Sequence, residues 1–466
     1  MQIQILDAIE CRVSRADGEL LFPCLSFESV YWKQGPFKRQ RKTYQKSVFS
    51  FKGKEFWRFY TGLLPRIRQW CVDQGIPLEV VGEEIRIKRQ NPPFLKGVTF
   101  RDDQLAMIDV ACSKQRGVIQ SPTGSGKTIM QLGLMSCYTK ARILLLAHSN
   151  DITSQTFNKL QEFGFKDSEL FGGGNLISKP TKRIVVSSMQ SFVKLPIEDY
   201  MTYFDIILLD EAHHLQIMKS KDKNNKQTNT TYVEILSHML APIRIGWTAT
   251  TRTNDEAVLV SEGLLGKVIG KMTVEEAAEL EILARPRLRF IKAKCSPAVM
   301  DLRKYSEVYE FAVVRNKPRN QQIAKCAKEF YDKGETTLIF VTQIAHGELI
   351  AEEIKSMFKI DVPFVQGIMP QKERNKVKNA LIKKMIKICI ATTSWSEGVD
   401  IQNLDSVIVA AGGKSEIQTL QRVGRGLRKT DGKDTATIVD ILDLSHNHLL
   451  RQLGERLAIY SDMGWL

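Results

Sequence analysis

A glycine-rich segment at residues 121–128, SPTGSGKT, constrains the fold of this chain more than any other feature. It follows a short apolar run at residues 117–120, and apolar residues resume at helical spacing over residues 128–132. A strand, a glycine-rich loop and a helix in this order bind phosphate, because glycines let backbone N–H groups face an anion at the helix N-terminus. The chain is therefore expected to form an α/β unit around this loop.

The end of the loop carries the residue types that ATP and magnesium need. Lys127 can reach the β- and γ-phosphates, and Thr128 offers a hydroxyl to Mg²⁺, which takes few protein ligands. The strict pattern opens with glycine, where this chain has Ser121, but the phosphate-facing Gly-Lys-Thr end is intact. The alternative is a glycine-rich turn before a surface helix. The predicted ATP-binding residues of the loop are Ser121, Pro122, Thr123, Gly124, Ser125, Gly126, Lys127 and Thr128.

A carboxylate pair follows a second apolar run, at residues 204–213, FDIILLDEAH. Four apolar residues in a row, at residues 206–209, are typical of a strand buried on both faces of a parallel sheet. Asp210 is expected to bind magnesium, and Glu211 to orient or deprotonate the attacking water. His213 and His214 lack the i, i+4 spacing of a helical metal site, so we interpret them as coupling residues. The alternative is a solvated strand end.

A basic segment far along the chain, residues 421–428, QRVGRGLR, can supply the remaining charge. Charge that spreads over the γ-phosphate is stabilised by an arginine aimed at it. Gln421, Arg425 and Arg428 are therefore predicted to complete the catalytic set with Lys127 and the carboxylates. Taken alone, the same arginines fit a solvated basic helix.

The order of these motifs over about residues 97–466 resembles that of the superfamily 2 helicases, which implies two tandem RecA-like lobes. The resemblance implies that Arg101 and Gln104 recognise the adenine base of ATP, and that Gly398 and Asp400 contact the nucleotide. It implies coupling through His213 and the triplet Thr248, Ala249 and Thr250. It implies nucleic-acid contacts at His148, Gln155, Gly173, Gly174, Ser188, Gln190, Thr342, Thr393 and Ser394.

Three blocks are expected along the chain: a small α+β domain at residues 1–92, a first lobe at 93–284 and a second lobe at 285–466. Apolar runs that alternate with helical segments predict a parallel sheet in each lobe. The expected strands are 143–147, 184–187, 205–210 and 243–247 in the first lobe, and 337–341, 387–391, 406–411 and 436–441 in the second. Helical structure is expected at 56–72 and in the basic stretch from 285 to 318, and a mobile polar loop at 219–226.

The N-terminal block contains a basic and aromatic stretch. Residues 33–54 hold eight Lys or Arg residues and no acid, interleaved with aromatic residues. Basic groups bind phosphates, so we predict nucleic-acid contacts at Lys38, Arg39, Arg41 and Lys42. The alternative is that these basic side chains only form a solvated surface. The aromatic residues, among them Phe49 and Phe51, are expected to form a core with Val48.

Bulk composition agrees with a polyanionic partner. The net charge is +15 and the pI about 9.3. The eight cysteines show no metal-binding spacing, which favours a reduced chain without structural zinc. No apolar run reaches the length of a membrane span, so we expect no membrane association and a place in the cytoplasm, or the host cytoplasm if the gene belongs to a phage.

The basic N-terminal block before two lobes is similar to the arrangement in the phage UvsW-type helicases, relatives of XPB-like and RecG-like enzymes. Residues 251–255, TRTND, lack the Arg-Glu-Asp triplet expected of the XPB-like group. The resemblance implies an ATP-dependent DNA helicase or translocase that remodels branched DNA. An ATP-dependent RNA helicase, a restriction-enzyme motor subunit, and an ATP-binding annealing or clamp protein without motor activity remain alternatives. Protein partners are not predicted.

Overall fold

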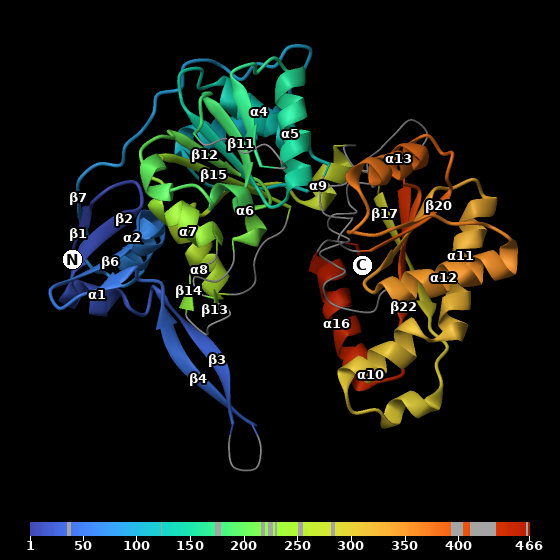
Figure 1. Cartoon of the computed structure of the whole chain (residues 1–466). Coiled ribbons are helices and arrows are strands. Elements are labelled where there is room, and N and C mark those ends of the chain that lie inside the picture. The colour runs from blue at the N-terminus through green and yellow to red at the C-terminus, as the bar shows by residue number, and fades with distance from the viewer. Residues whose placement is uncertain are drawn as a thin grey trace. The chain divides into compact units, whose positions relative to one another are not determined.

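A computed structural model describes residues 1–34, 39–122, 124–172, 179–215, 220–221, 227–228, 231–249, 255–280, 285–392, 404–410, 435–462 and 465–466. The chain divides into two compact units (Figure 1). One unit comprises Met1–Ser121 with Gly126–Lys271, and the other Pro122–Ser125 with Met272–Leu466.

The first unit contains a seven-stranded parallel sheet in the order β10-β11-β9-β12-β15-β8-β16. Its strands are β8 (Arg116–Gln120), β9 (Ile143–Ala147), β10 (Ser168–Phe171), β11 (Ile184–Ser188), β12 (Ile206–Leu209), β15 (Ile243–Thr248) and β16 (Val268–Lys271). Its helices are α3 (Asp102–Lys114), α4 (Lys127–Ser136), α5 (Asn150–Glu162), α6 (Met189–Phe192), α7 (Thr231–His238) and α8 (Asp255–Leu264), with 3₁₀ turns η2 (Ile197–Tyr200) and η3 (Ala212–His214).

This sheet confirms the predicted α/β class and the strands expected in the first lobe. Every residue of β9, β11, β12 and β15 is buried, as expected for parallel strands with both faces covered. Strands β12, β15 and β8 are neighbours, so the segments that follow them meet at one edge of the sheet. There the backbone N–H of Ser121 donates to the carbonyl of Thr248 at 2.9 Å.

The second unit contains a six-stranded parallel sheet in the order β17-β22-β21-β18-β20-β19. Its strands are β17 (Arg285–Lys292), β18 (Thr337–Val341), β19 (Phe364–Val365), β20 (Ile388–Thr392), β21 (Ser406–Val409) and β22 (Thr435–Leu442). The helical elements are α9 (Val274–Glu279), η4 (Pro297–Asp301), α10 (Tyr305–Tyr309), the π-helix η5 (Glu310–Val314), α11 (Lys317–Asp332), α12 (Ile344–Phe358), α13 (Gln371–Ile382) and α16 (Asn447–Asp462). The two parallel sheets are the two expected lobes.

The start of the second lobe differs from its prediction. Residues Arg285–Lys292 form β17, which pairs in parallel with β22 along its whole length, where a basic helical stretch was expected. Arginine and apolar residues alternate over 287–290, and alternation with period two is a strand signal that outweighs the basic composition. Within this stretch α10 and η5 are helical. The domain boundaries at residues 92 and 284 stay predictions.

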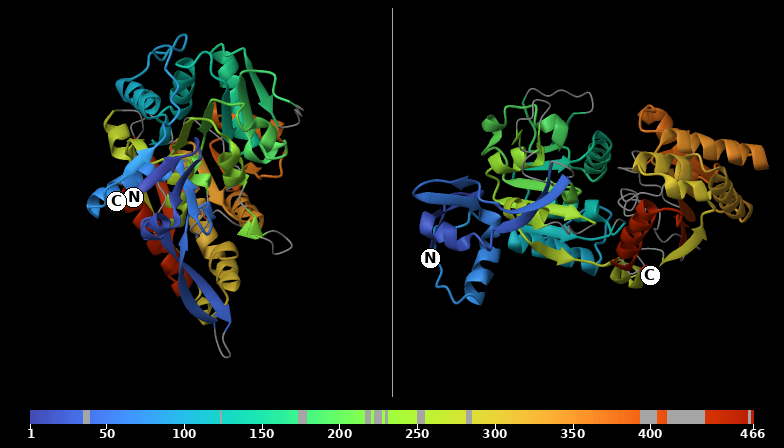
Figure 2. Two further views of the ribbon diagram at one scale, coloured as in Figure 1. Left: turned by 90° about the vertical axis from the view of Figure 1, so that its left-hand side faces the viewer. Right: turned by 90° about the horizontal axis from the view of Figure 1, so that it is seen from below.

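The N-terminal block holds a small mixed sheet in the order β5-β6-β2-β1-β7. Its strands are β1 (Gln2–Ile5), β2 (Glu10–Ser14), β5 (Phe51–Lys52), β6 (Phe56–Tyr60) and β7 (Glu79–Val81), with helices α1 (Arg15–Leu21) and α2 (Leu64–Asp73) and the 3₁₀ turn η1 (Thr61–Leu63). A separate antiparallel ribbon of β3 (Ser26–Gln34) and β4 (Arg39–Ser47) extends away from this sheet (Figures 1 and 2).

The helix expected at residues 56–72 begins only at Leu64. Phe56–Tyr60 is strand β6, antiparallel to β2, because its aromatic residues favour a pleated, half-buried surface. The ring of Trp57 meets Phe49 edge to face at 4.9 Å. Val48 and Phe49 are buried as expected, whereas Phe51 is 47% exposed and does not belong to the core.

Two further findings concern the expected loop and membrane spans. Within the polar stretch expected as a loop, Ser220–Lys221 pairs in antiparallel fashion with Gln227–Thr228, whereas residues 222–226 lie outside the described residues. In the described part of the chain, no helix is both long and apolar enough to cross a membrane.

Candidate nucleotide-binding and coupling site

The glycine-rich loop leads from β8 into α4. Gly124 and Gly126 have φ of 92° and 96°, a left-handed conformation that favours glycine. Gly126 is the N-cap of α4, and Lys127 is its first residue. The loop therefore turns sharply into a helix N-terminus, where backbone N–H groups bind anions.

Lys127 and Thr128 open the first turn of α4. The Nζ of Lys127 donates to the carbonyl of Ser121 at 3.1 Å, so the ammonium group lies across the start of the loop. Thr128 follows it in the same turn and is half-buried. This geometry suits an ammonium group that binds phosphate and a hydroxyl that binds a hard cation.

Gln104 of α3 reaches the loop. Its Oε1 accepts from the backbone N–H of Arg101 at 3.2 Å, and a Cβ placed on Gly126 would lie 2.5 Å from its Nε2. The guanidinium of Arg101 forms a bidentate ion pair with Asp103, with both contacts at 2.9 Å. Phe100 packs on Gly133 of α4, where a Cβ would lie 2.8 Å from its ring.

Asp210 lies at the end of β12 and is held by α4. Its Oδ1 accepts from Gln131 Nε2 at 3.2 Å and from the backbone N–H of Glu211 at 3.1 Å. Gln131 and Thr128 are three residues apart in α4 and share a helix face. A carboxylate and a hydroxyl are thereby brought to the same side of α4, and both are oxygen donors that fit magnesium.

Glu211 and His213 connect the ends of two strands. Glu211 is 6% exposed and has φ 51° and ψ 51°, which is uncommon for a residue with a side chain. The Nδ1 of His213 lies 3.3 Å from Glu211 Oε2 and 3.1 Å from Thr248 Oγ1. Ala249 follows Thr248 directly. One imidazole therefore joins the carboxylate after β12 to the hydroxyl at the end of β15.

His148 belongs to an aromatic cluster with His214 and Tyr232. The rings of His148 and His214 stack with centroids 3.9 Å apart and planes 5° apart. The Nδ1 of His148 lies 3.1 Å from the hydroxyl of Tyr232. The segment after β9 is thus packed against the segment that contains Asp210.

The remaining predicted nucleic-acid residues are distributed over several elements of the chain. The hydroxyl of Ser188 caps α6 and accepts from the backbone N–H of Ser191 at 3.3 Å. Gln155, Gln190 and Thr342 are exposed, on α5, on α6 and after β18. Arg39, Arg41 and Lys42 lie on β4, and only the backbone of these three residues is described. The predicted residues outside the described ones are Lys38, Thr123, Gly173, Gly174, Thr250, Thr393, Ser394, Gly398, Asp400, Gln421, Arg425 and Arg428.

Sequence reasoning missed Gln131 and Tyr232. Gln131 lies one helical turn beyond Thr128, and its buried amide is the signal that could have identified it. Nothing in the sequence around Tyr232 indicated its contact with His148.

The fold and this site define a phosphate-loop protein, with the glycine-rich loop at the carboxyl edge of a parallel sheet. Residues 97–253 match the family model of the type III restriction enzyme res subunit, and residues 321–430 match that of the helicase conserved C-terminal domain. The chain belongs to the superfamily 2 helicases and is an ATP-hydrolysing enzyme with a nucleic-acid partner.

Among its relatives is the ATP-dependent DNA helicase uvsW of Enterobacteria phage T4, 25% identical over 377 residues, which are 75% of this chain and 72% of the relative. The DNA 3'-5' translocase XPB2 of Sulfurisphaera tokodaii is 22% identical over 408 residues, 81% of this chain and 88% of the relative. In fold, the chain is similar to S. cerevisiae Dbp5 bound to RNA and ADP BeF3, at 16% identity and a TM-score of 0.55 over 78% of this chain and 92% of that one.

Proposed function

We propose that this protein is an ATP-dependent DNA helicase or translocase that remodels branched DNA by branch migration or fork regression. The observation that carries the motor function is the contact of His213 with both Glu211 and Thr248, which ties the catalytic carboxylate to the end of β15. DNA as the track is supported by relatives named as a DNA helicase and a DNA translocase.

The proposed chemistry assigns a task to each group in the loop and the carboxylate pair. Lys127 and the backbone N–H groups of the loop hold the β- and γ-phosphates, and Gln104 fixes the loop against α3. Thr128 and Asp210 would provide oxygen ligands for magnesium, and the bound ion would neutralise charge on the phosphates. Glu211 orients the attacking water and accepts its proton.

The second lobe is proposed to complete the catalytic set. Gln421, Arg425 and Arg428 are assigned to the γ-phosphate, with Gly398 and Asp400 at the nucleotide. An arginine finger contributes about a thousandfold or more to the rate of phosphoryl transfer, so its arrival acts as a switch for hydrolysis. ATP turnover would then require both lobes, at residues 93–284 and 285–466.

The N-terminal domain, residues 1–92, is proposed as the accessory DNA-binding domain. The register of the ribbon aligns Tyr31 with Lys42 and Trp32 with Arg41. Cations and aromatic residues alternate in this way where proteins bind the backbone and bases of nucleic acid. A two-stranded ribbon also fits the major groove of B-DNA, so a duplex arm of a branched substrate is a suitable partner.

A substrate panel tests the proposal. ATP turnover and product formation are measured with forks, four-way junctions, flayed duplexes and RNA duplexes of matched length. We expect branched DNA to stimulate turnover most and to be converted to rearranged products. Greater stimulation by RNA would favour an RNA helicase, and ATP binding without turnover would favour an annealing or clamp protein.

A deletion tests the accessory role. Removing residues 1–92 is expected to weaken binding of branched DNA more than it lowers basal turnover. Loss of basal turnover with unchanged DNA binding would contradict the role of this domain.

A further inference from the structure

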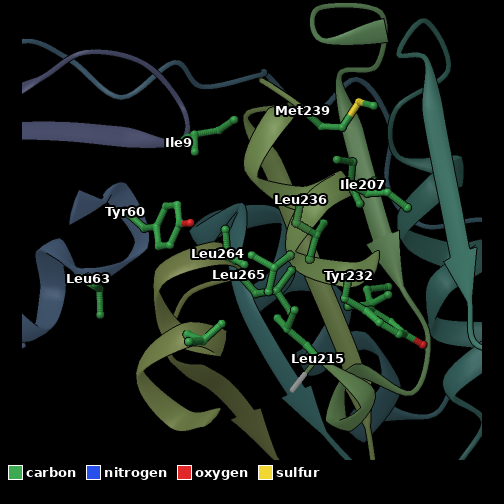
Figure 3. Packing of buried hydrophobic residues seen from close by; sticks show 14 of the residues in the cluster. Ile9, Tyr60, Leu63, Ile207, Leu215, Tyr232, Leu236, Met239, Leu264 and Leu265 are labelled. Carbon is green, nitrogen blue, oxygen red and sulfur yellow. The ribbon is translucent and has the colours of Figure 1, made fainter. Parts of the chain in front are cut away.

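Helix α8 lies between the N-terminal block and the segment that contains Thr248. It begins at Asp255, shortly after Thr248, and three N-terminal elements, β3, β6 and η1, contact it. Figure 3 shows Tyr60 of the N-terminal block pointing toward Leu264, and Leu63 and Leu265 belong to the same apolar core. The N-terminal block and α8 are therefore packed into one core.

A bidentate ion pair fixes this contact. Arg66 of α2 donates from Nε to Glu262 Oε2 at 2.5 Å and from Nη2 to Oε1 at 3.0 Å. The side chains are 34% and 16% exposed, so water screens the pair only partly. The hydrogen bond to Glu262 also raises the pKa of Arg66. Two parallel N–H···O bonds restrict direction as well as distance, and they hold α8 in one orientation.

The two backbones also approach closely beside this pair. A Cβ on Gly62 would lie 2.2 Å from the carbonyl oxygen of Glu262, and a Cβ on Gly263 would lie 3.0 Å from Tyr60 Cβ. Neither glycine has a positive φ. Glycine is needed here for close approach, and any added side chain would push α8 away from the N-terminal block.

Two pockets that are partly open to solvent border α8 beside this contact. One, of about 170 Å³, is lined by Val258, Ser261 and Glu262 of α8, and also by His213 and Thr248. The other, of about 670 Å³, is lined by Arg66 and Trp70 of α2 and by Val258 and Glu262. Protein interiors are close-packed, so α8 is packed less tightly here than a helix inside a core. Glu262 lines both pockets.

We infer that Arg66 is a positioning residue that acts through Glu262 to hold α8 beside His213 and Thr248, and thereby sets how much strand movement each ATP drives. DNA bound by the N-terminal domain would then act on the coupling residues through α8. This inference rests on the proposed function, because it takes His213 and Thr248 as the coupling residues.

Arg66→Ala in the full-length chain tests the inference. Phosphate release and strand displacement are measured on the same forked DNA at saturating ATP, and their ratio gives the strand displaced per ATP. We expect phosphate release within about twofold of the wild-type value and a fall in the ratio of about fivefold, since a charged hydrogen-bonded pair contributes more than 1 kcal/mol. The double variant Arg66→Glu with Glu262→Arg is expected to recover part of the ratio.

A matched control is Arg58→Ala, which removes a partly exposed ion pair with Glu10 inside the N-terminal sheet, at 3.2 Å. It is expected to leave the ratio unchanged. An Arg66→Ala protein with an unchanged ratio, or with both rates lowered by one factor, would overturn the inference. If Arg66→Ala does not fold, Glu262→Gln is measured in the same way. A fall in strand displaced per ATP would support the inference, and an unchanged ratio would overturn it. A wild-type protein whose ATP turnover DNA does not stimulate would overturn the proposed function itself.

Discussion

His213 Nδ1 lies 3.1 Å from Thr248 Oγ1, and the same nitrogen lies 3.3 Å from Glu211 Oε2. Thr248 is in turn tied to the phosphate loop, because its carbonyl accepts from the backbone N–H of Ser121. Side-chain contacts through His213 thus connect Glu211, after β12, to Thr248 at the end of β15. A backbone hydrogen bond connects Thr248 to Ser121 at the start of the loop. These contacts form the route by which we propose that ATP chemistry acts on the rest of the lobe.

Thr248→Val removes the hydroxyl at nearly constant volume. We expect strand displacement per ATP to fall about fivefold, because a buried hydrogen bond contributes about 1 kcal/mol. ATP turnover should stay within about threefold of the wild-type value. Thr248→Ser keeps the hydroxyl and should retain coupling. Equal losses in the Val and Ser variants would show that the hydroxyl has no coupling role.

Arg41→Ala and Lys42→Ala on β4 test DNA binding by the ribbon. Each cation that neutralises a phosphate steepens the salt dependence of affinity, so each variant should lower the slope of log K against log salt by about 1. The slope is measured by anisotropy titrations of forked DNA at several salt concentrations. Lys328→Ala on α11, where the lysine pairs with Asp332, is the control and should leave the slope unchanged. Equal slopes in all four proteins would remove the ribbon from the DNA interface.

The elements predicted best are those whose sequence signal is local. Strands β9 and β18 have the predicted bounds, because an uninterrupted apolar run can be buried only inside a covered parallel sheet. The phosphate loop and the Asp210 segment follow from fixed spacings beside such strands. His213 and Thr248, which were each predicted as coupling residues, lie 3.1 Å apart in the structure, and their coupling role stays a prediction.

What sequence reasoning missed depends on partners far along the chain. Strand β6 was expected as helix although its aromatic residues favour a strand, because its partner strand β2 lies far from it in the sequence. The Arg66 to Glu262 pair joins residues 196 positions apart, and each alone resembles an ordinary surface charge. Tyr232 likewise meets His148 only through the tertiary fold.

The second lobe offers a test of stability in its buried ion pair. Arg319 and Asp443 are 0% and 2% exposed and form contacts of 2.7 and 2.9 Å. Arg319→Met leaves a buried carboxylate without its partner and should destabilise α11 and β22 by about 3–5 kcal/mol. Native-state hydrogen exchange of peptides from these elements measures the change in the full-length chain.

A surface pair that joins β17 to the same helix, α11, serves as its control. Arg289 and Glu329 form a 2.9 Å contact with both side chains about two-fifths exposed, at 41% and 39%. Arg289→Met should change the same exchange free energies by less than about 1 kcal/mol. A similar loss of exchange free energy in Arg319→Met and Arg289→Met would show that burial of the first pair does not explain its larger effect.

His346 predicts an acid sensitivity of the second lobe. Burial holds the pKa of this imidazole well below its usual value, and the charge of Arg319 lowers it further. In the unfolded chain it binds a proton below about pH 6.5, whereas in the folded chain it stays neutral. Its contribution therefore favours folding above about pH 6.5, and stability is lost as the pH falls toward the folded pKa.

The slope expected from this one site is up to about 1.4 kcal/mol per pH unit below pH 6.5. Urea midpoints are compared between the wild-type protein and His346→Gln, which can still donate to Asn320, the present partner at 3.1 Å. The variant should lose this part of the pH dependence. Parallel pH profiles of the two proteins would show that His346 is not its source.

The most direct test of a nucleic-acid-driven ATP motor is steady-state phosphate release by the wild-type protein, Lys127→Ala and Glu211→Gln, with forked DNA, with RNA and with neither. We predict strong stimulation of the wild-type protein by DNA. Glu211→Gln should lower the stimulated rate at least about a hundredfold, as expected for loss of a general base, and Lys127→Ala should abolish it. Wild-type turnover that nucleic acid does not change, or stimulated turnover that survives in both variants, would contradict the account.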